Sequence, residues 1–94
     1  LAEGYPIVFG FSVPESMYSD ETTNTGVVKY PTAQETIIGG HAVLMVGYDE
    51  TKRRVKFKNS WGTGWGDGGY GYLPYEFISN GLASDFWTIR KAEL

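Results

Sequence analysis

Cysteine is absent from this chain of 94 residues. The chain can therefore form no disulfide, offers no thiolate to zinc and has no thiol nucleophile of its own. Histidine is almost absent as well, since His41 is the single one. A site built from His41 with Asp49 or Asp67 lacks the ligand number and spacing of a metal centre. We expect no metal and no other cofactor.

Long apolar runs and an excess of basic charge are also lacking. No apolar stretch approaches the ~20 residues that span a bilayer, so no membrane segment is predicted. The formal net charge is −3, and the eight Lys and Arg residues do not form one long block. This charge pattern disfavours nucleic-acid binding through phosphate neutralisation. The composition, with 41% hydrophobic and 16% aromatic residues, is typical of one globular domain.

The first residues, Leu1-Ala2-Glu3-Gly4, contain no initiating Met. Three helix formers followed by Gly4 and Pro6 resemble the end of a helix. We therefore expect residues 1–94 to be a piece of a longer polypeptide, although a recombinant product can begin in the same way.

Hydrophobic patterning predicts a small, mainly β domain with an antiparallel sheet. Strands are expected at residues 5–13, 26–30, 41–48, 54–59, 69–73 and 85–90. One helical turn is expected at 14–18, and a short helix at 74–79 with Pro74 in its first position. The polar stretches 19–26 and 31–35 are predicted to be loops, with Asp20 and Glu21 in solvent.

Residues 41–48 form the clearest strand pattern. They are apolar at both odd and even positions, which favours a central strand covered on both faces. Residues 54–59 alternate, which favours a strand with one face in water. The pair predicts a β-hairpin with a loop of four or five residues. Because Glu50 is midway between His41 and Asn59, these two side chains are expected opposite each other unless a bulge shifts the register.

A lone histidine is most simply a residue satisfied by hydrogen bonds at a strand end. The neighbouring motif Asn59-Ser60-Trp61-Gly62 favours a second interpretation. A histidine that acts as a general base needs an acceptor on its second ring nitrogen, which fixes its tautomer and orientation. An asparagine oxygen can do this without adding charge, and Trp61 could keep water from the contact.

The stretches "GGHAVLMVGYD" and "KNSWGTGWGDGGYGYL" resemble the C-terminal half of the papain-like cysteine peptidases. The resemblance is dense from Gly40 to Tyr72 and extends more loosely to an earlier strand and to "ASDFWTI". It implies that residues 1–94 form the C-terminal β domain of a two-domain α+β fold, with a barrel-like antiparallel sheet and a short helix. His41 would be the catalytic base, Asn59 would orient it, and Trp61 would shield the pair.

The same resemblance implies that half of the active site is missing from this chain. The nucleophilic cysteine of the family, and the glutamine that helps to bind the oxyanion, lie in the N-terminal half. Ser60 cannot replace the cysteine, because adjacent residues of a strand point to opposite faces. The expected partners are therefore the N-terminal half and a peptide or protein substrate. Without that half, an exposed face favours self-association.

Two other functions compete with peptide hydrolysis. The chain could be a non-catalytic binding or regulatory module of the same fold, or an inactive proteolytic fragment. "GWGDGG" matches a phosphate-binding pattern, but it leads into a predicted strand where phosphate binding needs a helix N-terminus.

Residues around the histidine and several aromatics carry further expectations. By family likeness Gly39, Gly40 and Ala42 border a substrate subsite, which their small side chains would leave roomy. Core positions are predicted for Phe9, Phe11, Tyr70, Tyr72, Phe77 and Phe86. For Tyr5, Trp65 or Trp87 we expect a position that faces the missing half and not the core.

Overall fold

Alternating apolar residues build one antiparallel sheet in the computed structural model, which describes residues 7–88. Its strands are β1 (Ile7–Pro14), β2 (Ile37–Asp49), β3 (Arg54–Lys58), β4 (Tyr70–Pro74) and β5 (Ala83–Thr88). Their order across the sheet is β4-β3-β2-β1-β5, and every neighbouring pair is antiparallel. The mainly β fold expected from the sequence is confirmed.

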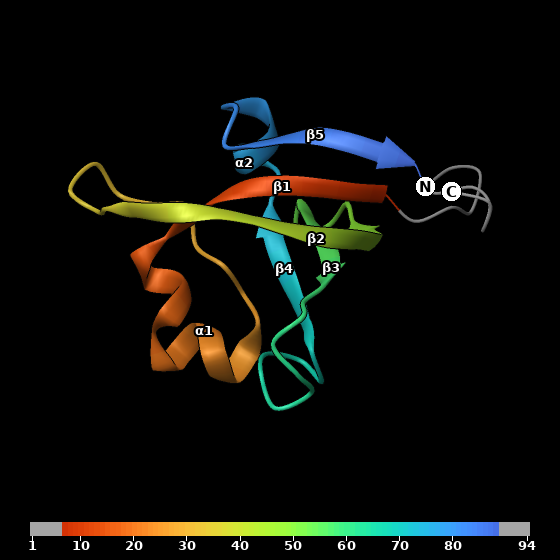
Figure 1. The fold of residues 1–94 in the computed structure, drawn as a ribbon, viewed down its shortest axis with the longest axis horizontal. Helices are drawn as coiled ribbons and strands as arrows, with labels where there is room; N and C mark the ends of the chain where they lie inside the picture. The colour runs from red at the N-terminus through yellow and green to blue at the C-terminus, as the bar shows by residue number, and fades with distance from the viewer. Residues whose placement is uncertain (1–6, 89–94) are drawn as a thin grey trace.

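The long strand β2 gives the sheet its curvature. Its first part pairs with β1 and its last part with β3, and the register of the second pairing shifts between Met45 and Gly47. Bulges of this kind bend a strand and increase its twist. β3 and β4 consequently run steeply across the direction of β1 and β5 (Figure 1). The sheet is barrel-like in its coiling, with β4 and β5 at its two edges.

One face of this curved sheet holds the hydrophobic core. Alternate residues of β1, β2 and β3 point into it, as the period of a strand requires. The buried hydrophobic residues of the described chain are Phe9, Phe11, Val13, Met17, Val28, Val43, Met45, Val55, Phe57, Trp65, Leu73, Phe77 and Ala83. Gly71 is needed in this packing, because a Cβ there would lie 2.4 Å from Cζ of Phe57.

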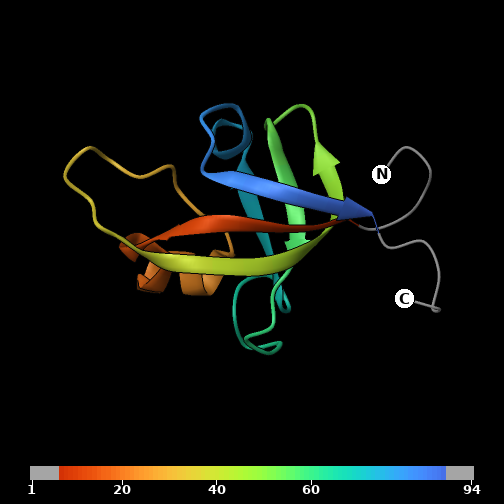
Figure 2. The ribbon, with the colours of Figure 1, turned by 45° about the horizontal axis from the view of Figure 1, so that its top comes forward.

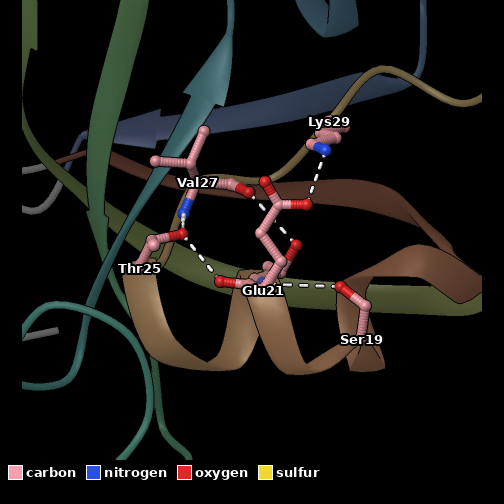
Figure 3. Close-up of polar contacts among 6 residues, drawn as sticks. Ser19, Glu21, Thr25, Val27 and Lys29 are labelled. Atoms are coloured by element: carbon pink, nitrogen blue, oxygen red, sulfur yellow. Dashed lines mark hydrogen bonds and ion pairs between the residues drawn. The ribbon is translucent and has the colours of Figure 1, made fainter.

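The predicted loop at 19–26 is wrong, because Asp20–Thr25 form the helix α1. Its N-cap Ser19 accepts a hydrogen bond from the backbone N–H of Thr22 at 3.2 Å, and Gly26 ends the helix with φ 78°. Glu21 also forms an ion pair with Lys29 (Figure 3). Asp20 and Glu21 are exposed as expected. The helix escaped prediction because it is polar almost all round and depends on its caps rather than on an apolar face.

The other short segments follow the sequence less closely. The turn at 14–18 is confirmed as the 3₁₀ helix η1 (Glu15–Tyr18). The strand expected at 26–30 is reduced to one bridge between Val27 and Tyr72. The second helix, α2 (Glu76–Ser79), starts later than predicted, because Pro74 still pairs with Arg54 in the sheet.

Aromatic residues divide between the core and the surface. Phe9, Phe11 and Phe77 are buried as predicted, and Tyr70 and Tyr72 are half-buried. Phe86 is 42% exposed, so its core assignment is wrong. Trp65 is only 6% exposed and packs inside this chain, so it does not face outward. Tyr5 and the side chain of Trp87 lie outside the described residues, as do the predicted helix end at 1–4 and residues 89–90.

The expectation that β2 is covered on both faces is also wrong for this chain. Val43 and Met45 are buried in the core, but Ala42 and Val46 are exposed and Leu44 is half-buried. Within residues 7–88, the helices and loops pack against the core side and leave this second apolar face open (Figure 2). None of the helices in this part of the chain is long and apolar enough to cross a membrane.

Candidate functional site

His41 lies near the middle of β2, where pairing with β1 holds its backbone. Its partner in the register is Phe11. The two rings meet edge to face, with centroids 6.0 Å apart and planes at 71°. The histidine is half-buried. The sheet therefore fixes the position of the imidazole and restricts its orientation from one side.

Asn59 directly follows β3 and is almost completely buried, at 6% exposure. Its backbone N–H donates to the carbonyl of Gly69 at 2.9 Å, which ties it to the glycine-rich loop. Its Oδ1 lies 2.8 Å from Nε2 of His41. The predicted contact between the two side chains is thus confirmed.

The register that predicted this contact is wrong. Asp49 pairs with Arg54 at the turn, so the hairpin is centred beyond Glu50. Pairing ends at Leu44 and Lys58, and continuing that register would place His41 opposite Trp61 and not opposite Asn59. The contact forms because Asn59 leaves the end of the strand and its side chain reaches back toward the ring. The two side chains are long enough to bridge this displacement, so His41 and Asn59 meet although they are not paired in the sheet.

The orientation of the Asn59 amide is determined by a second hydrogen bond. The backbone N–H of Ser60 donates to the same Oδ1 at 2.8 Å. An N–H donor requires an oxygen at this position, so the amide cannot be flipped. Oδ1 therefore accepts from both Ser60 and His41. It follows that Nε2 of the neutral imidazole carries the proton and that Nδ1 is left to exchange one.

Aromatic rings cover the contact. Trp61 stacks on His41, with centroids 5.2 Å apart and planes at 29°. Tyr18 stacks on Trp61 at 5.2 Å, and Trp65 meets Trp61 edge to face at 5.4 Å. The position predicted for Trp61 is confirmed. Tyr18 was missed, because nothing in the sequence connects a tyrosine of η1 to a histidine 23 positions later.

Glycines let the chain turn sharply between Trp61 and β4. Four of them, Gly62, Gly66, Gly68 and Gly69, have positive φ. At Gly66 a Cβ would lie 2.5 Å from the carbonyl oxygen of Tyr70, so only glycine fits there. The loop enters β4 and no helix follows it directly. The expectation that these glycines shape a turn is confirmed.

Open space adjoins His41 along β2. Gly39 and Gly40 are exposed, and a Cβ at either position would meet nothing within 4 Å. Ala42 is exposed and lines a shallow depression of about 380 Å³ together with Val8 and Leu44. The three small residues expected at a subsite are thus placed beside the histidine, and their contact with substrate stays a prediction.

Other kinds of site find little support in the described chain. Residues 7–88 contain no group of three or more His, Asp and Glu side chains that could hold a metal ion.

Two buried hydrogen-bond donors near the histidine, Nδ2 of Asn59 and Nε1 of Trp65, have no acceptor among these residues. Buried polar groups normally have a hydrogen-bond partner, so these two donors are an unusual feature of the residues around the histidine.

Known proteins are similar to this chain in sequence and in fold. The family model of the papain family cysteine proteases matches residues 1–86. An uncharacterized peptidase C1-like protein of Acanthamoeba polyphaga mimivirus is 49% identical over 92 residues, which are 97% of this chain and 30% of that protein. A cathepsin B-like protein of Giardia intestinalis is 39% identical over 74 residues, 74% of this chain and 23% of its own length.

A solved structure agrees with these relatives. Xylellain, a cysteine protease from Xylella fastidiosa, is similar with a TM-score of 0.84 and 46% identity. The match covers 97% of this chain and 34% of that one. The chain therefore spans about a third of the length of the mimivirus protein and of xylellain.

The hydrogen bond to Asn59 predicts the tautomer of His41. At a pH where the ring is neutral, two-bond ¹H–¹⁵N NMR spectra should show the proton mainly on Nε2. Asn59→Ala removes the acceptor and should shift the ring toward a mixture of tautomers. Asn24→Ala, at an exposed position of α1, should change nothing. A predominant Nδ1–H form in the unaltered chain would contradict the geometry.

Proposed function

Because this chain belongs to the papain family of cysteine proteases, we propose that it supplies half of a cysteine-peptidase active site. His41 acts as the general base, and Asn59 orients it. The observation that carries this proposal is the 2.8 Å contact from Nε2 to Oδ1, which leaves Nδ1 as the reactive nitrogen. Peptide bonds are the substrate implied by the family.

The chemistry follows from the free nitrogen. Nδ1 takes the proton of a cysteine thiol, and the resulting thiolate attacks the carbonyl carbon of the peptide. The imidazolium then gives its proton to the leaving amine, and an acyl thioester remains. A water molecule, deprotonated at Nδ1, attacks the thioester, and the proton returns to the thiolate as the acid is released.

Asn59 suits this cycle because it is a neutral acceptor. The thiolate and imidazolium already attract each other as an ion pair, so a third charge is not needed to create the nucleophile. What the ring needs is a fixed rotation that keeps Nδ1 toward the sulfur. Oδ1 provides this, and Trp61 shields the hydrogen bond from water, in which it would be weaker.

The cysteine must come from another part of the protein. None of the 94 residues is a cysteine, and this chain spans about a third of the length of the mimivirus protein and of xylellain. We propose that residues 1–94 are the C-terminal β domain, and that an N-terminal half supplies the thiol and an oxyanion-binding glutamine. The cleft would lie between the two halves.

The open face of β2 fits such a partner. Ala42, Leu44 and Val8 line its depression, and Val46 is 39% exposed. Exposed apolar surfaces of this kind mark interfaces more often than free surfaces of monomers. The face also adjoins Asn59, which lines the same depression. Docking here would bring the other half to the edge of the candidate site.

The central test measures turnover in the full-length polypeptide. Asn59→Ala should lower kcat by on the order of tenfold to a hundredfold with little change in KM, because Asn59 positions the base and does not contact substrate. His41→Ala should cost more, on the order of 10⁴-fold, because it removes the base. Trp61→Ala should resemble Asn59→Ala. Steady-state kinetics with a fluorogenic peptide provide the measurement.

Controls separate this mechanism from its alternatives. Asn24→Ala should leave kcat unchanged, a thiol-alkylating reagent should abolish turnover, and a chelator should not. Full activity of His41→Ala would refute the assignment. An intact two-half protein without turnover would favour the non-catalytic binding module.

The docking face can be tested without catalysis. Leu44→Glu places a charge in the apolar depression and should weaken association of the two halves, expressed as separate chains, by at least tenfold. Ile78→Glu is the matched control, because Ile78 is 37% exposed and lies on α2 instead. Titration calorimetry measures both affinities. Equal affinities for the two variants would place the interface elsewhere. Self-association of the chain alone should respond to Leu44→Glu in the same way.

A further inference from the structure

A polar groove lies between η1 and the segment that leads into β2. Its volume is about 580 Å³, and its lining includes Glu15, Ser16, Tyr18, Thr32 and Glu35. The backbone N–H of Glu15 donates to the carbonyl of Thr36 at 3.0 Å, which holds its two walls together. No residue with a proposed catalytic role lines this groove.

The groove is connected to the candidate site through aromatic rings. Tyr18 forms part of its wall and stacks on Trp61, which stacks on His41. Each of these two stacking steps is 5.2 Å between ring centroids, so the near wall of the groove lies within about 10 Å of the histidine ring. An extended substrate rises ~3.3 Å per residue, so it reaches the groove behind this wall three to four residues from the bond that is cut.

The groove carries negative charge without a cation to balance it. Glu35 accepts hydrogen bonds from the backbone N–H groups of Ser16 at 2.7 Å and Thr32 at 3.4 Å. The nearby Ser16 hydroxyl and these N–H groups lower the pKa of Glu35, so it stays ionised at neutral pH. Glu15 is exposed. Among the described residues, the one ion pair joins Lys29 to Glu21 and involves neither carboxylate.

An aromatic ring in the wall of the groove also suits a bound cation. Tyr18 is 61% exposed, and a tyrosine ring attracts cations through its face. The walls thus offer two carboxylates and an aromatic ring, which together match an ammonium or guanidinium group.

We propose that this groove is a subsite for a lysine or arginine side chain of the substrate, three to four residues from the scissile bond. The inference rests on the proposed function, because it assumes that a peptide passes His41. Glu15 and Glu35 are its specificity-determining residues. Lysine and arginine donate to carboxylates through three and five N–H groups respectively, and both are long enough to reach into an open groove from an extended backbone.

The kinetic test uses the full-length polypeptide and matched peptides. Lysine or glutamine is placed in turn at the second to fifth positions on each side of the scissile bond. At one position lysine should raise kcat/KM by about twofold to fivefold, the range of an exposed ion pair, and added salt should reduce this preference. Glu35→Gln should remove most of the preference and Glu15→Gln part of it. Thermal unfolding confirms that each variant is folded.

Glu76→Gln is the matched control, because Glu76 is an exposed carboxylate on α2, on the other side of the molecule from α1 (Figure 1). It should leave the preference unchanged. A second arm needs no turnover: the His41→Ala protein should bind the preferred lysine peptide more tightly than its glutamine analogue in a fluorescence titration.

The outcomes distinguish a failure of the cation subsite from a failure of the proposed peptidase function. If the full-length protein cuts no peptide, the proposed function fails, and the binding arm alone decides whether the groove takes a cation. If it cuts lysine and glutamine peptides equally at every position, the proposed function stands and the subsite is refuted. A lysine preference that survives in the Glu15→Gln, Glu35→Gln double variant also refutes it.

Discussion

The hydrogen bond between His41 and Asn59 is the interaction to which the rest of the structure contributes. Its two residues are 18 positions apart, one in β2 and the other directly after β3. Nε2 of His41 and Oδ1 of Asn59 lie 2.8 Å apart. β1 holds the backbone of His41, and the glycine-rich loop holds the backbone of Asn59. Ser60 fixes which atom of the amide faces the ring. Each of these supports limits the rotation of the imidazole.

The glycine-rich loop connects this hydrogen bond to the hydrophobic core. It carries Trp61 over the histidine and buries Trp65 beneath, where the two indoles meet edge to face. Trp65 in turn packs on Phe57 and leaves no room for a side chain at Gly71. Movement of this loop would therefore disturb both the core and the cover over the site. Stability and preorganisation of the site depend on the same contacts.

The open face of β2 has the opposite character. Its apolar residues were interpreted from the sequence as a strand covered on both sides, but the described chain covers one side. An apolar face of this kind is what a packing partner outside residues 7–88 would cover. The proposed N-terminal half accounts for that apolar face, for the missing cysteine and for the short match to longer relatives. One partner explains three separate observations.

The sequence predicted features that depend on local pattern. The strands, the turn at η1 and the pairing of His41 with Asn59 follow from alternation and from a dense family motif. Contacts between distant segments could not be found in this way. Tyr18 reaches Trp61 only because η1 folds against the glycine-rich loop, and nothing in the local residue pattern indicates the register shift after Met45. The helix α1 was not predicted although Ser19 and Gly26 cap its two ends, because its residues have no apolar stripe.

The proposed role of His41 as the base of a cysteine-peptidase site is tested most directly by the pH dependence of thiol alkylation in the full-length polypeptide. An imidazolium beside the sulfur stabilises the thiolate, so the active-site cysteine should react with iodoacetamide well below the pH range of a free thiol, whose pKa is about 8.5. His41→Ala should abolish this low-pH reactivity and return the cysteine to ordinary behaviour. A cysteine that reacts identically with and without His41, or a full-length protein without any cysteine near Nδ1, would contradict the claim that this chain supplies the base of a cysteine-peptidase site.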